Sequence, residues 1–403
     1  MRPRPRLRAI RITDRFLGVS DRDALWLYIG FTLLVMLILL VTALAIDLVY
    51  AMPNVVSKAR ETSVSTPVIL APYMLYRTVD IVSRLLVQAC FFGIFLAEII
   101  RIRRLECIVL ALSGMSPIRA LAPILAFGVL AGGFQFTCEA WARPAAVFAQ
   151  IDLGVGRYAH RFQPMLRPQS DWFLQPDTAI RARVKTGEAP ELHNISKFSG
   201  LSRHKLTQVI LAQKAVPTNK PDIWLFSNVV IWTPQADQNT WVQKALPDLE
   251  VRLKLRPEQL RYFGMNGYYL KWPDLRKVAA LPDTPGYADA QVSLWLRWTA
   301  VLLPGVVALM AASLAQTGFQ GRRQNTSLLV ALAIFGYLIV VSFKVFWVLG
   351  ELGTLPPWIS VLSPLFLVAG IGALSVAGQM VASPKLLRSG EVFRNFLTRN
   401  QRP

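Results

Sequence analysis

Residues 24–50 read ALWLYIGFTLLVMLILLVTALAIDLVY, and Asp47 is the one charged residue in this stretch. A bilayer core about 30 Å thick requires about 20 apolar residues of α-helix to cross it. The stretch exceeds that length and therefore predicts a transmembrane helix. The composition of the whole chain agrees, because 53% of its 403 residues are hydrophobic and its mean hydropathy is +0.40.

Further apolar segments lie on either side of a long, more polar insert. Two follow the first helix and three follow the insert: Thr78–Ile100, Leu121–Phe136, Ser293–Ala315, Ser327–Gly350 and Trp358–Ala382. Together they predict six transmembrane helices in a three-plus-three arrangement. We place the helical segments at residues 24–140 and 291–382, the insert at residues 141–290, and basic tails at residues 1–23 and 383–403.

The insert has the pattern of an all-β domain. Apolar or alternating stretches separated by turn-forming residues predict short strands. These stretches are Gln208–Gln213, Ile223–Thr233, Thr240–Lys244 and Leu249–Leu255. Several short strands with regular turns are typical of a sandwich, a jelly roll or an open barrel. Residues 257–260 and 272–277 predict short helical turns leading back to the membrane. Between the first two membrane helices, residues 51–66 contain Pro53 and predict a short connection.

The net charge of +20 comes largely from basic residues concentrated in four places. They are the segment before the first helix, residues 101–119, the pair Arg322 and Arg323, and the segment after the last helix. If six spans alternate, all four fall on one side of the membrane, and the positive-inside rule makes that side the cytoplasm. Both termini are then cytoplasmic and the insert is periplasmic. Because topology accounts for these charges, nucleic-acid binding is not expected.

The sequence contains no recognisable catalytic motif. His160, His193 and His204 form no close pair of metal ligands, and the chain has neither a phosphate-binding glycine loop nor a nucleophile elbow. We therefore predict a non-catalytic protein without a cofactor or a bound metal.

Charged residues inside the predicted helices are the first candidates for a functional site. Asp80 and Arg84 lie four residues apart on one helix face, and Arg77 precedes Asp80 by three positions. Two interpretations stay open: an ion-paired helix end near the membrane interface, or a polar patch facing a substrate cavity. Lys344 has no obvious local partner, so it either snorkels to the interface or faces an acidic ligand.

Two further charged residues, Asp47 and Arg297, are expected near the outer interface. Taken together, the four cations in or beside the helices suit an anionic amphiphile better than a neutral one. These cations are Arg77, Arg84, Arg297 and Lys344.

Residues 101–118 read RIRRLECIVLALSGMSPI and predict a short amphipathic helix at 103–116 on the cytoplasmic side. The apolar residues Leu105, Ile108, Val109 and Leu112 follow helical spacing. Gly114 is a suitable helix stop, and Pro117 prevents continuation. Considered alone, Glu106 is expected to be a solvated surface charge.

This same segment resembles the cytoplasmic coupling helix of the lipopolysaccharide-export permeases, the LptF/LptG family, with Glu106, Ser113 and Gly114 at its marked positions. Residues 139–144 (EAWARP) resemble the end of the family's third helix, and residues 257–275 resemble its return to the membrane. Residues 355–364 (LPPWISVLSP) resemble the G member more than the F member. The resemblance covers nearly the whole chain in the same order.

The resemblance implies one half of a transporter in the bacterial inner membrane. An LptF-like paralogous subunit would complete a central cavity for lipopolysaccharide, and helices one and five would form lateral gates. An LptB-like ATPase dimer would dock on the coupling helix through Glu106, with Arg103, Arg104 and Gly114 beside it. Lipopolysaccharide carries phosphates, so cationic residues in the cavity make electrostatic sense. The candidate residues of the cavity and its gates are the cations Arg77, Arg84, Arg297 and Lys344 together with the carboxylates Asp47 and Asp80.

The resemblance also implies that the periplasmic domain is a β-jelly roll. Its open edges would pair with LptC/LptA-like periplasmic jelly-roll proteins by strand addition. One alternative of a different class remains, namely an envelope scaffold or mechanotransmission protein that is coupled to a cytoplasmic ATPase but moves no substrate through its own helices.

Overall fold

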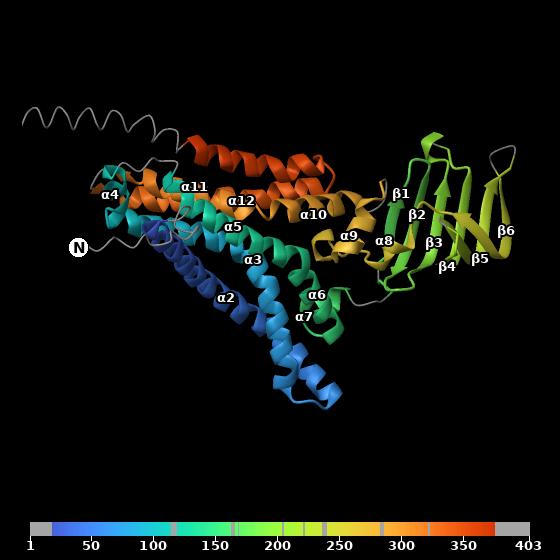
Figure 1. Cartoon of the computed structure of the whole chain (residues 1–403). Helices are drawn as coiled ribbons and strands as arrows, with labels where there is room; N and C mark the ends of the chain where they lie inside the picture. The colour runs from blue at the N-terminus through green and yellow to red at the C-terminus, as the bar shows by residue number, and fades with distance from the viewer. Residues whose placement is uncertain are drawn as a thin grey trace, which may run out of the picture. The chain divides into compact units, whose positions relative to one another are not determined.

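The computed structural model describes residues 18–113, 119–162, 166–167, 169–203, 205–220, 222–235, 240–282, 286–320 and 323–374 (Figure 1). Gly114, Arg322, most of the first basic tail and the whole of the last one lie outside the described residues. The chain divides into two compact units. The first contains residues 1–47, 78–143 and 295–403, and the second contains residues 48–77 and 144–294.

Among the described residues, five helical stretches are long and apolar enough to cross a membrane, and a bent pair of helices makes a sixth if it counts as one span. The continuous stretches are α2 (Val19–Thr62), α3 (Thr66–Arg103), Arg119–Leu153, α12 (Thr326–Glu351) and Pro357–Leu374. The bent pair is α10 (Tyr287–Thr299) with α11 (Leu303–Thr317), which meet at 63°. The predicted multi-span membrane architecture is therefore confirmed.

Prolines account for the two irregular spans. Pro304 stands in the first turn of α11 and cannot donate to a carbonyl one turn earlier, so the chain bends between α10 and α11. The span Arg119–Leu153 consists of η1 (Arg119–Leu121), α5 (Ala122–Thr137), a π-helical turn η2 (Cys138–Ala142) and α6 (Arg143–Leu153). Pro144 follows the π-helical turn, where the Arg143 N–H reaches back five residues to Cys138 O.

The helices of the first unit pack around α3. The buried share of the most apolar window is 61% for α3, 11% for α2 and 22% for α12. Phe91 and Ile94 of α3 are fully buried together with Val307 of α11. The centre of this bundle is therefore α3, whereas α2 and α12 present long apolar faces outward.

Small residues bring α5 and α11 into close contact. Gly128 and Gly132 form a G-x-x-x-G pattern on α5, and the Cα of Gly305 lies against Gly128. Membrane helices use such small residues to let backbones approach each other, because apolar side chains gain nothing over lipid. A Cβ atom built on Gly132 would lie 1.9 Å from the carbonyl oxygen of Val301.

The predicted connection at residues 51–66 is wrong in its extent. Helix α2 continues to Thr62 with Pro53 inside it, and α3 begins at Thr66. Ala51, Val55 and Ala59 on this extension are buried in a cluster with residues of α3 and with Val155. The packing of this helical hairpin within the second unit outweighs the local signal of the proline, whose missing N–H removes a single bond of the helix.

The described part of the inserted domain contains one antiparallel sheet with six strands in chain order (Figure 1). They are β1 (Asp171–Leu174), β2 (Thr178–Lys185), β3 (Glu191–Ser199), β4 (Gln208–Pro217), β5 (Ile223–Pro234) and β6 (Trp241–Arg252). The expected all-β insert is thus confirmed. Its described strands form a simple meander, because each one pairs with the next through a short turn, whereas a jelly roll combines two Greek keys.

The edge strand β6 replaces the two short strands expected at Thr240–Lys244 and Leu249–Leu255. It pairs with β5 along its whole length, from Trp241 opposite Pro234 to Arg252 opposite Ile223. Pro247 interrupts the sequence pattern, but a proline is tolerated on an edge strand because the side facing solvent needs no N–H donor. Strands β1 to β3 lie before the stretches that the sequence predicts as strands. The sequence does not predict them because their polar residues weaken the alternating pattern.

The sheet packs its apolar face against the chain that follows it. Leu253, Leu255 and Leu260 are buried with the side chains of the sheet, and the Trp224 indole donates to Leu255 O at 2.8 Å. Short helices complete the second unit: α7 (Gly156–Phe162), α8 (Pro257–Arg261), η4 (Gly267–Tyr269) and α9 (Trp272–Ala279). The helical turns expected at 257–260 and 272–277 are confirmed by α8 and α9.

Candidate functional site

Two clusters of buried polar residues lie inside the helical bundle of the first unit. The first, called the Glu98 network here, joins three helices through Tyr28 of α2, Glu98 and Arg101 of α3 and Gln316 of α11. The Arg101 guanidinium lies 2.7 Å from Glu98 Oε1. The Tyr28 hydroxyl donates to Glu98 and accepts from Arg101. Gln316 Nε2 donates to the second Glu98 oxygen at 3.4 Å.

The charges of the Glu98 network are removed from solvent. Glu98 and Tyr28 are fully buried and Arg101 is 5% exposed. A buried charge is tolerated when it is paired and its remaining hydrogen-bonding groups are satisfied. In return, the network holds α2, α3 and α11 in one arrangement.

The Glu98 network extends to the predicted coupling segment. Helix α3 ends at Arg103, Leu105 adopts a positive φ of 59°, and α4 begins at Glu106 and runs to Leu112. Glu106 Oε2 lies 3.3 Å from Arg101 Nε, and Glu106 Oε1 lies 3.8 Å from Arg104. Arg103 is exposed at the end of α3. The carboxylate expected to be a solvated charge is therefore bound to a buried arginine.

The second cluster, called the Arg143 network here, surrounds the π-helical turn. Arg143 Nε lies 3.0 Å from Asp80 Oδ1 on α3, and its Nη1 lies 3.0 Å from Glu139 Oε2. Ser83 donates to Glu139 at 2.8 Å, and Gln135 donates to the Ser83 carbonyl at 3.0 Å. Asp80 is fully buried and Arg143 is 7% exposed. This network joins α3 to the third span.

The predicted cavity residues differ in their surroundings, and Arg297 interacts electrostatically with Glu139 and Arg143 of the Arg143 network. Asp80 and Arg84 lie 3.5 Å apart, and the Arg84 side chain is 48% exposed whereas that of Asp80 is buried. Arg77 belongs to the second unit, where its guanidinium lies 5.3 Å from the centre of the Tyr158 ring. Arg297 is 2% exposed within α10, and Asp47 is partly exposed on α2.

Lys344 has a local partner that its sequence spacing conceals. Its ammonium group lies 3.3 Å from Glu351 Oε1, seven residues later on α12. Seven residues make two turns, so both side chains lie on the same helix face. The view that Lys344 lacks a local partner is therefore wrong.

The sequence alone does not predict the roles of Arg143 and Tyr28. Arg143 lies within residues 139–144, and its contact with Asp80 joins residues 63 positions apart. Tyr28 sits in an apolar run without a polar neighbour in sequence. The sequence signal for Arg143 is its position beside a proline at the end of a membrane helix. The sequence carries no such signal for the role of Tyr28.

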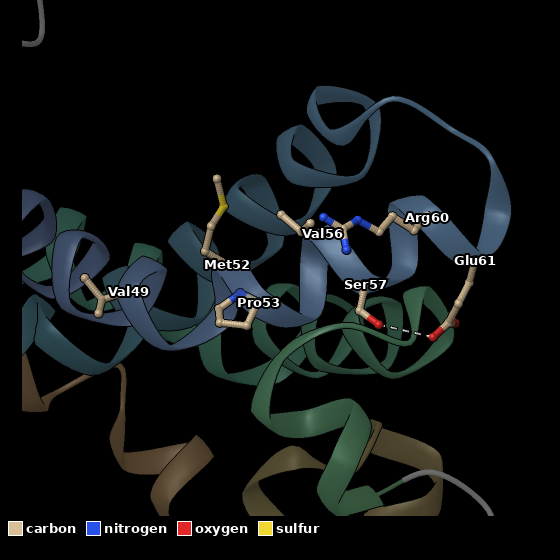
Figure 2. A pocket seen from close by; sticks show the side chains of 7 residues that line it. All are labelled: Val49, Met52, Pro53, Val56, Ser57, Arg60 and Glu61. Carbon is tan, nitrogen blue, oxygen red and sulfur yellow. Dashed lines mark hydrogen bonds between the residues drawn. The ribbon is translucent and has the colours of Figure 1, made fainter.

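A hollow of about 550 Å³ lies along the extension of α2 around Pro53 (Figure 2). Figure 2 shows Met52, Pro53 and Val56 along it, with a hydrogen bond of 3.3 Å between Ser57 and Glu61. All its lining residues come from this one helix, so the hollow offers a ligand a single wall and we assign no site to it.

These features define a multi-pass membrane protein with an inserted sheet domain and a short helix attached to a buried network. Residues 24–377 match the family model described as lipopolysaccharide export system permease LptF/LptG, and the chain belongs to this family. A comparison with curated proteins finds no match. The permeases of this family are non-catalytic transmembrane subunits of an ABC transporter that extracts lipopolysaccharide, and membership implies an ATPase and a paralogous permease as partners.

Proposed function

We propose that α4 is the coupling helix of this permease and that the Glu98 network transmits its displacement to α2 and α11. The observation that carries the proposal is the attachment of Glu106 to the buried Arg101. The apolar face of α4 supports it, because Val109 and Leu112 are 62% and 82% exposed and offer a surface for a partner. Arg103, Arg104 and Gly114 complete the segment that contacts the ATPase.

The partners follow from the family and from the charge distribution. The ATPase is an LptB-like dimer on the cytoplasmic side, where the positive-inside rule places both termini. The second permease is LptF-like, because residues 355–364 favour the G member for this chain. The outward apolar faces of α2 and α12 form the lateral gates, and the sheet edges β1 and β6 pair with LptC/LptA-like proteins in the periplasm. We propose that the first three membrane helices occupy residues 24–140, the periplasmic domain residues 141–290 and the last three membrane helices residues 291–382.

Charge reversal tests the coupling. Glu106→Lys places an ammonium group beside Arg101 and Arg104, so we expect α4 to detach from the network and ATP turnover by the purified complex to fall about tenfold. Glu61→Lys is the matched control, because Glu61 is an exposed carboxylate that pairs with Lys58 on the far end of α2. Unchanged ATPase co-purification and ATP turnover in Glu106→Lys would refute the coupling role.

A crosslinker distinguishes the permease from the scaffold alternative. A photoreactive amino acid replacing Arg84 should capture lipopolysaccharide in cells, because its side chain is half-exposed at the edge of the Arg143 network. The same photoreactive amino acid at Trp172, an exposed residue on the sheet edge β1, tests for capture by the inserted domain. Failure to capture glycolipid at Arg84 and at Lys344 would favour a scaffold that moves no substrate through its helices.

A further inference from the structure

A cavity of about 710 Å³ lies within the second unit. Its walls come from α6, α7, the turn between β2 and β3, α8 and α9. Pockets of about 300–1,000 Å³ are typical of sites for small ligands. The cavity is therefore large enough for a ligand of several rings.

Cations held over aromatic rings are the distinctive feature of this cavity. Four of the lining cations lie 4.9–5.5 Å from the centre of a ring that also lines it. The pairs are Arg161 over Phe162, Lys271 over Phe148, Arg167 over Phe263 and Arg261 over Tyr262. An aromatic face attracts a cation without consuming its N–H donors, so these groups remain able to bind an anion.

The backbone around Gly264 leaves space for the Arg167 side chain. A Cβ atom on Gly264, whose φ is +79°, would lie 2.1 Å from the Arg167 guanidinium. Arg167 Nη2 also donates to Phe263 O at 2.8 Å. The glycine and the carbonyl hold this arginine in a defined position.

The carboxylates of the cavity leave part of its positive charge uncompensated. Glu188 pairs with Arg261 at 3.1 Å, and Asp274 accepts a hydrogen bond from Tyr262 at 2.9 Å. Burial and this hydrogen bond raise the pKa of Tyr262 to about 12, so the phenol stays protonated as the donor. With Asp152, three carboxylates face the four cations, an excess of one positive charge. No carboxylate among the described residues lies within ion-pair distance of Arg161 or Lys271.

We infer that this cavity binds the phosphate-bearing saccharide portion of the transported glycolipid outside the membrane bundle. Aromatic and apolar side chains suit the faces of sugar rings, and Arg161 and Lys271 supply charge-assisted hydrogen bonds to a phosphate. The volume excludes the many acyl chains of the same molecule, so the ligand is its headgroup. The inference rests on the transport function of the family and adds a binding step within the second unit.

The test uses the complete transporter reconstituted with lipopolysaccharide and ATP. A photoreactive amino acid replaces Met265, which lines the cavity, and adducts with glycolipid are quantified. We expect Lys271→Met combined with Arg161→Gln to reduce the adduct about tenfold or more, because each change removes a charge-assisted bond. Arg276→Gln is the matched control: Arg276 is on α9, which follows Lys271 directly, and lies 5.2 Å from the Trp272 ring, but it does not line the cavity.

Two further arms make the result decisive. Dephosphorylated lipopolysaccharide should give about tenfold less adduct at Met265, and equal adducts from both forms would overturn the assignment of a phosphate ligand. Adducts unchanged in the double variant would overturn the site. A crosslinker at Arg84 in parallel separates the two proposals, because capture there without capture at Met265 refutes this cavity alone, whereas capture at neither position also refutes transport through the bundle.

Discussion

Arg143→Gln should destabilise the helical bundle by about 3–5 kcal/mol, since it removes the ion pair of 3.0 Å between Arg143 and the buried carboxylate of Asp80. The same change removes the ion pair with Glu139 in the π-helical turn. Desolvated charges are tolerated only when paired, and a lost partner costs more than the pair itself contributes. Thermal unfolding of the detergent-solubilised protein, followed by the loss of the monodisperse species, measures the effect.

Arg84→Gln provides the control for this prediction. Arg84 lies 3.5 Å from the same carboxylate, but its side chain is 48% exposed, so its removal should cost less than about 1 kcal/mol. Adding Asp80→Asn to Arg143→Gln should recover part of the loss, because it removes the buried negative charge that Arg143 compensates. Equal melting temperatures for the two arginine variants would show that Arg143 does not stabilise the bundle by ion pairing.

The second large effect is expected at a glycine. Gly132→Ala places a methyl group 1.9 Å from the carbonyl oxygen of Val301, so α5 and the turn before α11 must separate. Overpacking typically costs about 1–3 kcal/mol, and here the obstacle is backbone, which cannot rotate away as a side chain does. We expect a clear decrease in the melting temperature and a larger decrease for Gly132→Val.

Gly133→Ala is the neighbouring control. Nothing lies within 4 Å of a Cβ atom at Gly133, so no contact opposes the change. Alanine is favoured over glycine in a helix by about 1 kcal/mol, and this variant should therefore melt at the same or a slightly higher temperature. A decrease of similar size in both variants would mean that the close approach of α5 and the Val301 carbonyl does not govern stability.

The sequence predicted the membrane spans and the all-β insert better than it predicted the ends of the elements. Residues 24–50 predicted a membrane helix because a run of about twenty apolar residues fits the core of a bilayer, whatever lies around it. The extension of α2 through Pro53 to Thr62 was missed because burial against α3, rather than local preference, stabilises it. Strand β6 was divided in two because Pro247 is acceptable only at a sheet edge, and edges are defined by pairing.

For the candidate site too, the sequence predicted some contacts and not others. The i, i+4 spacing of Asp80 and Arg84 was visible in the sequence, and the two side chains do lie within ion-pair distance. The contacts of Glu106 with Arg101, and of Lys344 with Glu351, also lie within two helical turns, yet each depends on where a helix ends or which face it buries. Their partners therefore follow from packing.

By itself, the sequence determined that this chain crosses a membrane several times around a strand-rich insert, because hydrophobic length and alternation are properties of consecutive residues. It also carried the family resemblance that the match over residues 24–377 bears out. Only the tertiary structure decided which buried charges meet. Asp80 and Arg143 are 63 residues apart, and Tyr28 and Glu98 are 70 apart, so each contact exists only after the helices that carry these residues have packed together.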